Sequence, residues 1–178
     1  MTVFWEHGYE GASLTSLTEA MGIGRKSMYA AFGNKEDLFR AALERYAEGP
    51  GGYVVNALGA PTAHGVAEAF LAGAARSTTM PDRPAGCLGV QGALATGETG
   101  RPAREALIEW RSGGQALLNR RFRRAVEEGD LPPDADCELL ARFVMTVANG
   151  IAVQAASGAS LRDLERVIKM AMRSWPPS

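Results

Sequence analysis

The side chains best suited to contact another molecule lie between Gly22 and Phe39. Arg25, Lys26, Ser27 and Tyr29 follow one another there within one short segment. An arginine can pair bidentately with guanine, and a lysine can reach a base or a phosphate. Hydroxyl and ammonium groups also bond phosphate oxygens, which positions a protein on DNA without specifying the sequence. These residue types are compatible with contact to double-stranded DNA if a helix presents the segment to the major groove.

Two short helices across a tight turn would position these side chains. The first helix is expected to start at a Ser13 cap, whose oxygen accepts from free first-turn amides, and to end at Gly22, since glycine readily adopts the left-handed conformation. Its apolar face has helical spacing and consists of Leu14, Leu17, Ala20 and Met21. The second helix covers about residues 25–31, and the pair makes a helix-turn-helix. A Gly turn alone also occurs in helical proteins of other kinds.

A further helix follows, from about residue 35 to residue 47. Asn34 can cap it, and the acidic Glu36 and Asp37 suit the positive end of its dipole. Its apolar face consists of Leu38, Phe39, Ala42, Leu43 and Tyr46. A run of three glycines and a proline over residues 49–52 interrupts this helix. The sequence therefore predicts one domain of residues 1–48 and a second of residues 49–178.

The run GYEGASLTSLTEAMGIGRKSMYAAFGNKEDLF resembles the DNA-binding signature of the TetR family of bacterial one-component repressors. The likeness covers about the first 48 residues and keeps the spacing of each motif. It implies that the helix at 25–31 enters the major groove, and that residues around it clamp the DNA backbone. The DNA contacts that the resemblance implies are Ser13, Thr15, Arg25, Lys26, Ser27, Tyr29 and Lys35.

Some positions depart from the family pattern or allow a simpler role. Ala31 stands where the family commonly has a histidine, and Gly24 where a serine or threonine caps the reading helix. Both departures leave the affinity and the operator sequence open. Tyr29 can alternatively pack against the preceding helix, and Lys35 can be an ordinary solvated lysine of a first turn.

The first helix of the DNA-binding domain is truncated relative to the family. Residues 1–8 correspond to its last two turns only. We expect either an upstream segment that this sequence lacks or a start codon assigned within the gene, and we favour the missing segment. A chain that truly starts at Met1 would leave Leu17, Ile23 and Phe32 poorly covered, which predicts a weakened or mobile DNA-binding module.

Beyond residue 52 every periodic segment is helical, which makes the expected fold all-α. The expected helices cover residues 62–79, 87–96, 101–128, 134–157 and 160–174. By resemblance to the TetR family, this C-terminal part binds an effector and forms a homodimer through helices 134–157 and 160–174. The alternative is that these two helices close the core of a monomer.

The resemblance also implies an effector pocket among the C-terminal helices, and an apolar cavity with a few polar groups is the usual form of such a site. The predicted lining residues are Phe70, Cys87, Leu88, Gln91, Trp110, Phe122, Met145 and Asn149. The aromatic members can alternatively be plain core. Gln91 and Asn149 are better candidates, because an amide in an apolar helix needs a ligand, a water or a backbone partner.

Cys87 allows a second kind of sensing. It opens the predicted helix at 87–96, and a helix amino terminus can stabilise a thiolate that reacts with electrophiles or oxidants. The alternative is a small buried hydrophobe, because free cysteines are often buried.

The arginines at 120, 121, 123 and 124 form the densest basic run. Two of them stand four residues before a glutamate, which favours a solvated, salt-bridged helix face over a second nucleic-acid surface.

Composition excludes several classes of protein. The net charge is −1, so no global positive field attracts nucleic acid. The chain has no apolar run of about 18 residues and no secretory signal, which predicts a cytoplasmic protein without a membrane span. Two cysteines and two histidines without paired spacing predict no metal and no cofactor. An enzyme using Cys87 with His64 or His7 is disfavoured, since no third group is evident to orient the histidine.

We therefore expect a homodimeric repressor that binds a near-palindromic operator and leaves it when a small, largely apolar molecule enters the second domain. The alternative is a helical ligand-binding protein or thiol-based electrophile sensor with weak or lost DNA binding.

Overall fold

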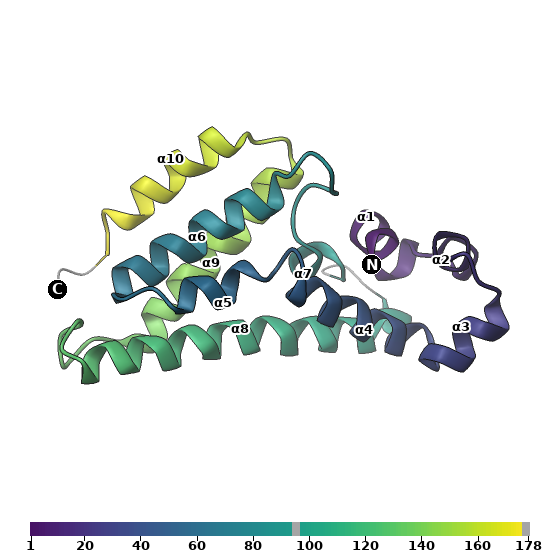
Figure 1. Ribbon diagram of the computed structural model, residues 1–178, viewed down its shortest axis with the longest axis horizontal. Coiled ribbons are helices and arrows are strands. Elements are labelled where there is room, and N and C mark those ends of the chain that lie inside the picture. The colour runs from purple at the N-terminus through teal and green to yellow at the C-terminus, as the bar shows by residue number, and fades with distance from the viewer. Residues whose placement is uncertain (94–96, 176–178) are drawn as a thin grey trace.

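The computed structural model describes residues 1–93 and 97–175, and the elements in these residues are all helical. A small group of helices, α1 to α4, lies at one end of the molecule, and the long α8 runs beneath both this group and a larger bundle (Figure 1). The elements are α1 (Thr2–Gly11), α2 (Leu14–Met21), α3 (Arg25–Phe32), α4 (Lys35–Glu48), α5 (Tyr53–Leu58), α6 (Ala63–Thr78), α7 (Leu88–Gln91), the 3-10 helix η1 (Glu98–Gly100), α8 (Arg101–Glu127), α9 (Cys137–Ala156) and α10 (Leu161–Met172).

The capping residues expected for the N-terminal helices are confirmed. The Ser13 side chain accepts a hydrogen bond from the Ser16 amide, at 3.0 Å, and so starts α2. Gly22 ends that helix in the left-handed conformation, with φ of 65°. Asn34 and Asp37 form a reciprocal capping box at the start of α4. These local interactions fix the turn between α2 and α3 and the direction in which α4 leaves it.

Helix α1 is short but contributes to the core. Its Phe4 and Trp5 side chains are buried, and Gly8 kinks the helix with φ of 68°. Among the three residues expected to be poorly covered in a chain that starts at Met1, Leu17 is buried, whereas Ile23 and Phe32 are only partly buried.

Two apolar cores hold the molecule together. The larger one fills the C-terminal bundle, where α6 packs against α9 and α5, and α9 against α8. The second core joins the N-terminal helices to later parts of the chain: Phe39 and Tyr46 of α4 share it with Leu88 of α7 and Leu107 of α8. The division near residue 48 stays a prediction, but side chains from both sides of it are buried in this second core.

Some helices differ from those expected. Helix α5 is not predicted by the sequence, because glycines flank this short helix on both sides. The helix expected at 87–96 is the much shorter α7, which ends at Gln91 and is followed by a turn at Gly92; residues 94–96 of that prediction lie outside the described residues. Helix α9 is long and apolar enough, by length and composition alone, to cross a membrane. Core helices can have the same length and composition, and α9 packs against α6 and α8.

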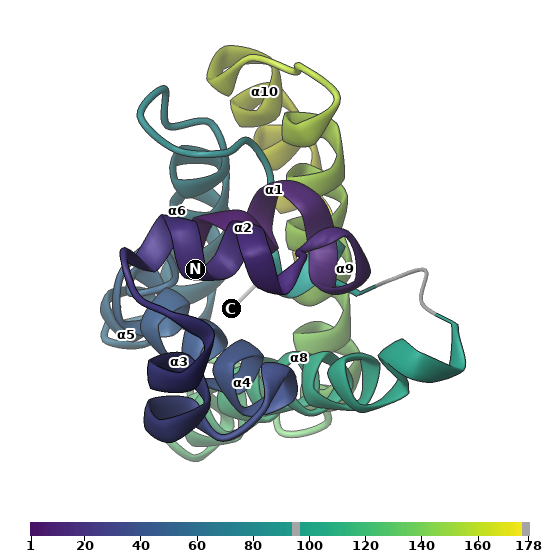
Figure 2. The same cartoon turned by 90° about the vertical axis from the view of Figure 1, so that its right-hand side faces the viewer.

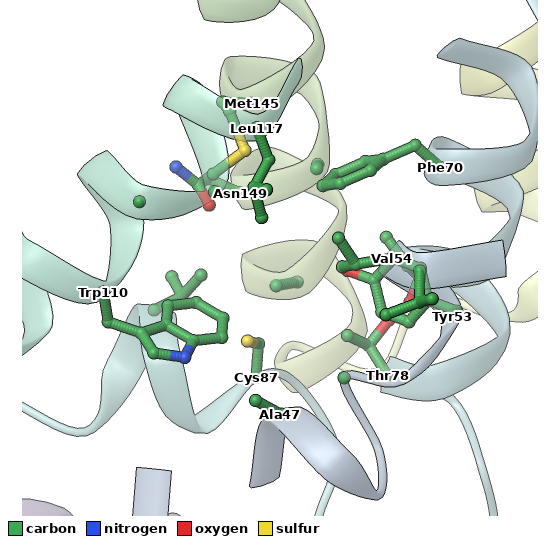
Figure 3. A pocket seen from close by; sticks show the side chains of 18 of the residues that line it. Ala47, Tyr53, Val54, Phe70, Thr78, Cys87, Trp110, Leu117, Met145 and Asn149 are labelled. Carbon is green, nitrogen blue, oxygen red and sulfur yellow. The ribbon is translucent and has the colours of Figure 1, made fainter. Parts of the chain in front are cut away.

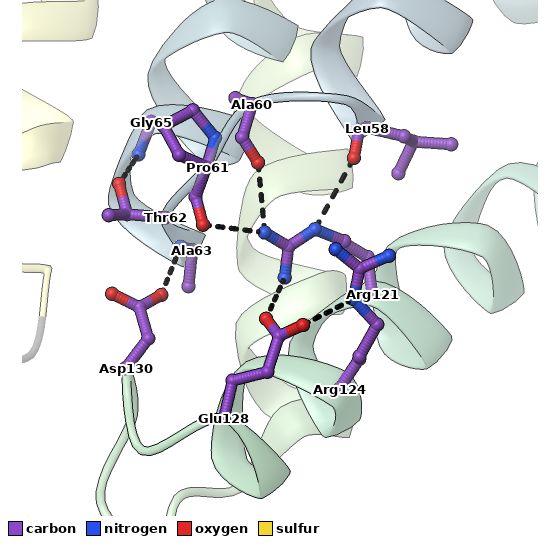
Figure 4. A network of polar contacts seen from close by, with 10 residues as sticks. All are labelled: Leu58, Ala60, Pro61, Thr62, Ala63, Gly65, Arg121, Arg124, Glu128 and Asp130. Carbon is purple, nitrogen blue, oxygen red and sulfur yellow. Dashed lines mark hydrogen bonds and ion pairs between the residues drawn. The ribbon is translucent and has the colours of Figure 1, made fainter.

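The arginine run on α8 is only partly a solvated face. Arg124 pairs with Glu128 at 2.9 Å, as expected, whereas Arg123 donates to Asn119. Arg121 is only 6% exposed, which contradicts the prediction. Its guanidinium donates to the carbonyl oxygens of the turn between α5 and α6, and the Asp130 carboxylate accepts from the Ala63 amide beside it (Figure 4). Backbone carbonyls that lie far away in sequence therefore keep Arg121 inside.

Candidate DNA-binding surface and effector cavity

The helix-turn-helix forms one tip of the molecule. Leu17 of α2 and Met28 of α3 are buried and hold the two helices together. On the outer side of α3, Arg25, Lys26 and Ser27 are exposed. Figure 2 views the molecule from this end, with α3 and α4 towards the viewer and the bundle behind. The amino end of α3 is thus exposed at this tip of the molecule.

The predicted DNA contacts on α2 and α3 lie together. The Arg25 guanidinium donates to the Thr15 hydroxyl at 2.9 Å, which joins the two helices at the surface. Tyr29 is 45% exposed and therefore available. The Ser13 hydroxyl is within 2.9 Å of the Ser16 hydroxyl and caps α2. The Thr15 hydroxyl and the Arg25 guanidinium therefore meet at the surface, and both are groups that bond phosphates or base edges.

Lys35 is held in a different manner from a freely solvated lysine. Its ammonium lies over the Tyr9 ring, 4.5 Å from the centroid, in a cation–π contact. Burial lowers the pKa of Lys35, while the charge of Glu10 acts in the opposite sense. The Tyr9 ring in turn packs edge-on against Phe39. The position of Lys35 is therefore coupled to the kinked end of α1.

A cavity of about 380 Å³ lies within the bundle, between α5, α6, α8 and α9, with α4 and α7 closing one end (Figure 3). Five predicted residues line it: Phe70, Cys87, Trp110, Met145 and Asn149. Several other lining residues were not predicted, chiefly Tyr53 and Val54 of α5, Thr78 of α6, Val90 of α7 and Leu117 of α8. Recognising α5 as a helix would have suggested Tyr53, because α5 packs closely on α6.

Three predicted lining residues lie elsewhere. Leu88 is buried in the second core with the N-terminal helices. Phe122 packs on Trp175 at the far end of the bundle, with 5.4 Å between ring centroids. The Gln91 amide has a backbone partner, since it donates to the Ala85 carbonyl at 3.3 Å. Helical spacing identified all three as inward-facing residues, but it does not tell a void from a packed core.

Cys87 lines the cavity as a buried thiol. Burial raises its pKa, and this effect outweighs the opposing influence of the Tyr46 hydroxyl and the neighbouring α7 amides. Burial therefore disfavours the thiolate that a helix start was expected to stabilise, and favours the alternative of a small buried side chain. The helix that follows Cys87 has only four residues, so its dipole is weak, whereas the loss of solvent around the sulfur is nearly complete.

Aromatic contacts connect the cavity to the DNA-binding end. The Trp110 ring forms part of the cavity wall and meets Tyr46 of α4, with 6.1 Å between centroids. Tyr46 meets Trp5 of α1 at 4.9 Å. Beside them, Arg40 of α4 pairs with Glu109 of α8 at 3.2 Å. The cavity wall at Trp110 therefore contacts α4 through Tyr46, and α4 follows directly after the helix-turn-helix.

Helix α7 provides another connection. Its residue Val90 lines the cavity, and the carbonyl of the following Gly92 accepts from the Tyr9 amide at 2.7 Å. Glu10 accepts from the Gly97 amide at 3.0 Å. The kinked end of α1 is thus hydrogen-bonded to the segment that follows the cavity wall.

Comparison with known proteins gives matches over both parts of the chain. Residues 1–42 match the family model described as bacterial regulatory proteins, tetR family, and residues 67–171 match the model described as tetracyclin repressor-like, C-terminal domain. The transcriptional repressor ComR of Escherichia coli K12 is 30% identical over 178 residues, which covers 99% of this chain and 85% of ComR.

Solved structures are similar over nearly the whole chain. A cysteine mutant of the TetR family regulator CifR, in complex with 26-base-pair operator DNA, matches with a TM-score of 0.94 and 43% identity, covering 98% of this chain and 92% of CifR. A putative TetR regulator from Rhodococcus sp. RHA1 matches with a TM-score of 0.68 and 39% identity, covering 99% and 94% of the two chains.

Proposed function

Because this chain belongs to the TetR family of bacterial transcriptional regulators, we propose that it represses transcription as a homodimer bound to a near-palindromic operator. A small, largely apolar molecule that enters the cavity releases it from the DNA. The family consists of regulators and not of enzymes, and this protein acts in the cytoplasm, where its DNA is.

The observation that carries this proposal is the exposed amino end of α3. Arg25, Lys26 and Ser27 lie there without apolar cover, and CifR, which has the same arrangement of helices, binds operator DNA. In our proposal α3 enters the major groove, where Arg25 exchanges its bond to Thr15 for a base edge or a phosphate. Ser13, Thr15, Tyr29 and Lys35 contact the backbone on either side.

The proposed dimer forms through α9 and α10. Both helices expose apolar side chains to solvent, namely Leu139 and Val153 on α9, and Val167 and Met170 on α10. The small residues of α9 divide between two roles: Ala148 and Ala152 face the monomer core, whereas Gly150 is open to a partner. A two-fold axis at this surface would present two α3 helices to successive major grooves, about 34 Å apart.

In this proposal the ligand binds most tightly to the conformation in which the two α3 helices are wrongly spaced for the operator, and so releases the protein from the DNA. A ligand against Trp110 would favour a different position of Tyr46 and α4, and through them of the helix-turn-helix. Ligand affinity and operator affinity are then reciprocally coupled. Burial raises the pKa of the Cys87 thiol, which disfavours electrophile sensing through a thiolate at this residue.

A gel-shift assay tests the proposal. The full chain, confirmed as a folded dimer, is titrated at low salt against DNA from upstream of its own coding region. We expect a discrete shifted band, and an Arg25→Ala variant that folds normally should bind more weakly. Failure of the folded wild-type dimer to bind this DNA would overturn the proposal.

A further inference from the structure

The cavity in the bundle presents mostly carbon to its interior. Phe70, Trp110, Leu117 and Met145 form much of its wall, and the described lining residues include no lysine, arginine or histidine. Small-molecule sites of this kind take an apolar body and orient it with few polar groups. The polar groups that are present therefore define what else the ligand must carry.

Three neutral polar side chains in the wall make no hydrogen bond within the described part of the chain: the Tyr53 hydroxyl of α5, the Trp110 indole N–H of α8 and the Asn149 amide of α9. The Tyr53 hydroxyl and the Asn149 amide lie on opposite sides of the cavity. Figure 3 places Asn149 beside Met145 and Leu117 on one side of the cavity, and Tyr53 beside Val54 and Thr78 on the other. The Thr78 hydroxyl differs from them, because it already donates to the Ala74 carbonyl at 2.7 Å.

Both groups can serve a neutral ligand at physiological pH. Burial raises the pKa of Tyr53, so the phenol stays protonated and remains a hydrogen-bond donor. A primary amide donates and accepts in equal measure. Polar groups in protein interiors are normally paired, and a ligand oxygen between these two walls would pair them.

Charged ligands do not suit this cavity. Glu109 is the carboxylate in its wall, but it is 78% exposed and already paired with Arg40. Arg111, whose charge acts on Cys87, donates to the Gly89 carbonyl and does not line the cavity. A ligand carboxylate would thus lose its water without gaining a cationic partner, which is strongly unfavourable.

We infer that the effector is an uncharged, mainly apolar molecule with an acceptor oxygen, such as a carbonyl, which hydrogen-bonds to Tyr53 or Asn149. This inference rests on the proposed function, because it identifies the chemistry of the ligand that releases the DNA. Tyr53 and Asn149 are the residues that would favour an oxygen-bearing molecule over a hydrocarbon or a carboxylate of equal size.

Three probes with one carbon framework test the inference: benzylacetone, butylbenzene and phenylbutyrate. Binding to the full-length dimer is measured by calorimetry, without DNA. We expect benzylacetone to bind about tenfold more tightly than butylbenzene, which is the net effect of one to two hydrogen bonds. Phenylbutyrate should bind most weakly. Tyr53→Phe or Asn149→Leu should reduce the preference for the ketone and leave butylbenzene binding unchanged.

Thr78→Val is the matched control, because it removes a lining hydroxyl whose hydrogen bond is already satisfied. It should retain the full preference for benzylacetone. Equal binding of the ketone and the hydrocarbon, strongest binding of phenylbutyrate, or binding of none of the three would overturn the inferred ligand class. Operator binding is followed separately by gel shift, so a protein that binds its operator while showing the wrong probe preference refutes this inference and not the proposed repressor function.

Discussion

Replacing the buried Arg121 by methionine should destabilise the protein strongly. The guanidinium donates to the carbonyls of Leu58, Ala60 and Pro61, at 3.3, 2.8 and 3.0 Å. Hydrogen bonds to charged groups contribute about 1.5–3 kcal/mol each, so the three together amount to roughly 5–9 kcal/mol. Methionine removes a buried charge, and water can reach some of the freed carbonyls, which together offset about half of the loss. We expect a net decrease in the free energy of unfolding of about 3–4 kcal/mol.

Thermal unfolding at one fixed protein concentration measures this effect, so that any self-association contributes equally to the wild-type and variant samples. A decrease of that size corresponds to about 6–16 °C in Tm for a domain of this length. Arg142→Met on α9 is the matched control: its pair with Glu138 is exposed, and such pairs contribute less than about 1 kcal/mol. Arg124 is unsuitable, because its partner Glu128 also lies 3.9 Å from Arg121. An Arg121→Met protein within about 0.5 kcal/mol of wild type would refute the reasoning, since the hydrogen bonds would then only offset the desolvation of the guanidinium.

Four further predictions concern separate parts of the molecule. Arg25→Ala should weaken operator binding by about 1–3 kcal/mol in a gel shift at constant salt; an unchanged Kd would exclude Arg25 as a base contact. Met170 is 73% exposed on α10, so Met170→Asp should shift the dimer towards monomer in analytical ultracentrifugation, and an unaltered sedimentation profile would place the interface elsewhere. A methyl group at Gly89 would lie 2.2 Å from the Trp110 ring; Gly89→Ala should therefore lower stability by about 1–3 kcal/mol in a denaturant titration, unless the ring moves at no cost. Alkylation of Cys87 by iodoacetamide should accelerate only above the pH at which a free cysteine ionises, because burial raises the thiol pKa; rapid alkylation at neutral pH would contradict this.

The sequence predicted the helix-turn-helix well because its signals are local. Ser13, Gly22 and Asn34 each act on amides or dihedral angles within one turn of their own position. Helix α5 has no such signal, since Gly52 and Gly59 flank it without a side-chain cap, and it forms through its packing on α6. Short helices surrounded by glycine depend on tertiary contacts, which a single sequence does not display.

The cavity was predicted less completely, for a different physical reason. Helical spacing identifies which face of a helix is inward, and on that basis Trp110 and Phe122 of α8 look alike. Trp110 lines the void, whereas Phe122 is packed against Trp175. Likewise, the burial of Arg121 depends on carbonyls of a turn about sixty residues earlier. Such distinctions arise only when distant segments meet.

The second core has a consequence for building hybrid regulators. Phe39 and Tyr46 of the DNA-binding end are buried against Leu88 and Leu107, which come from the middle of the chain. In a chimera that joins residues 1–48 to the effector domain of another repressor, Phe39 and Tyr46 would pack against residues other than Leu88 and Leu107. The unit that can be transplanted intact is therefore discontinuous in sequence: the first four helices together with the surface that α7 and the start of α8 supply.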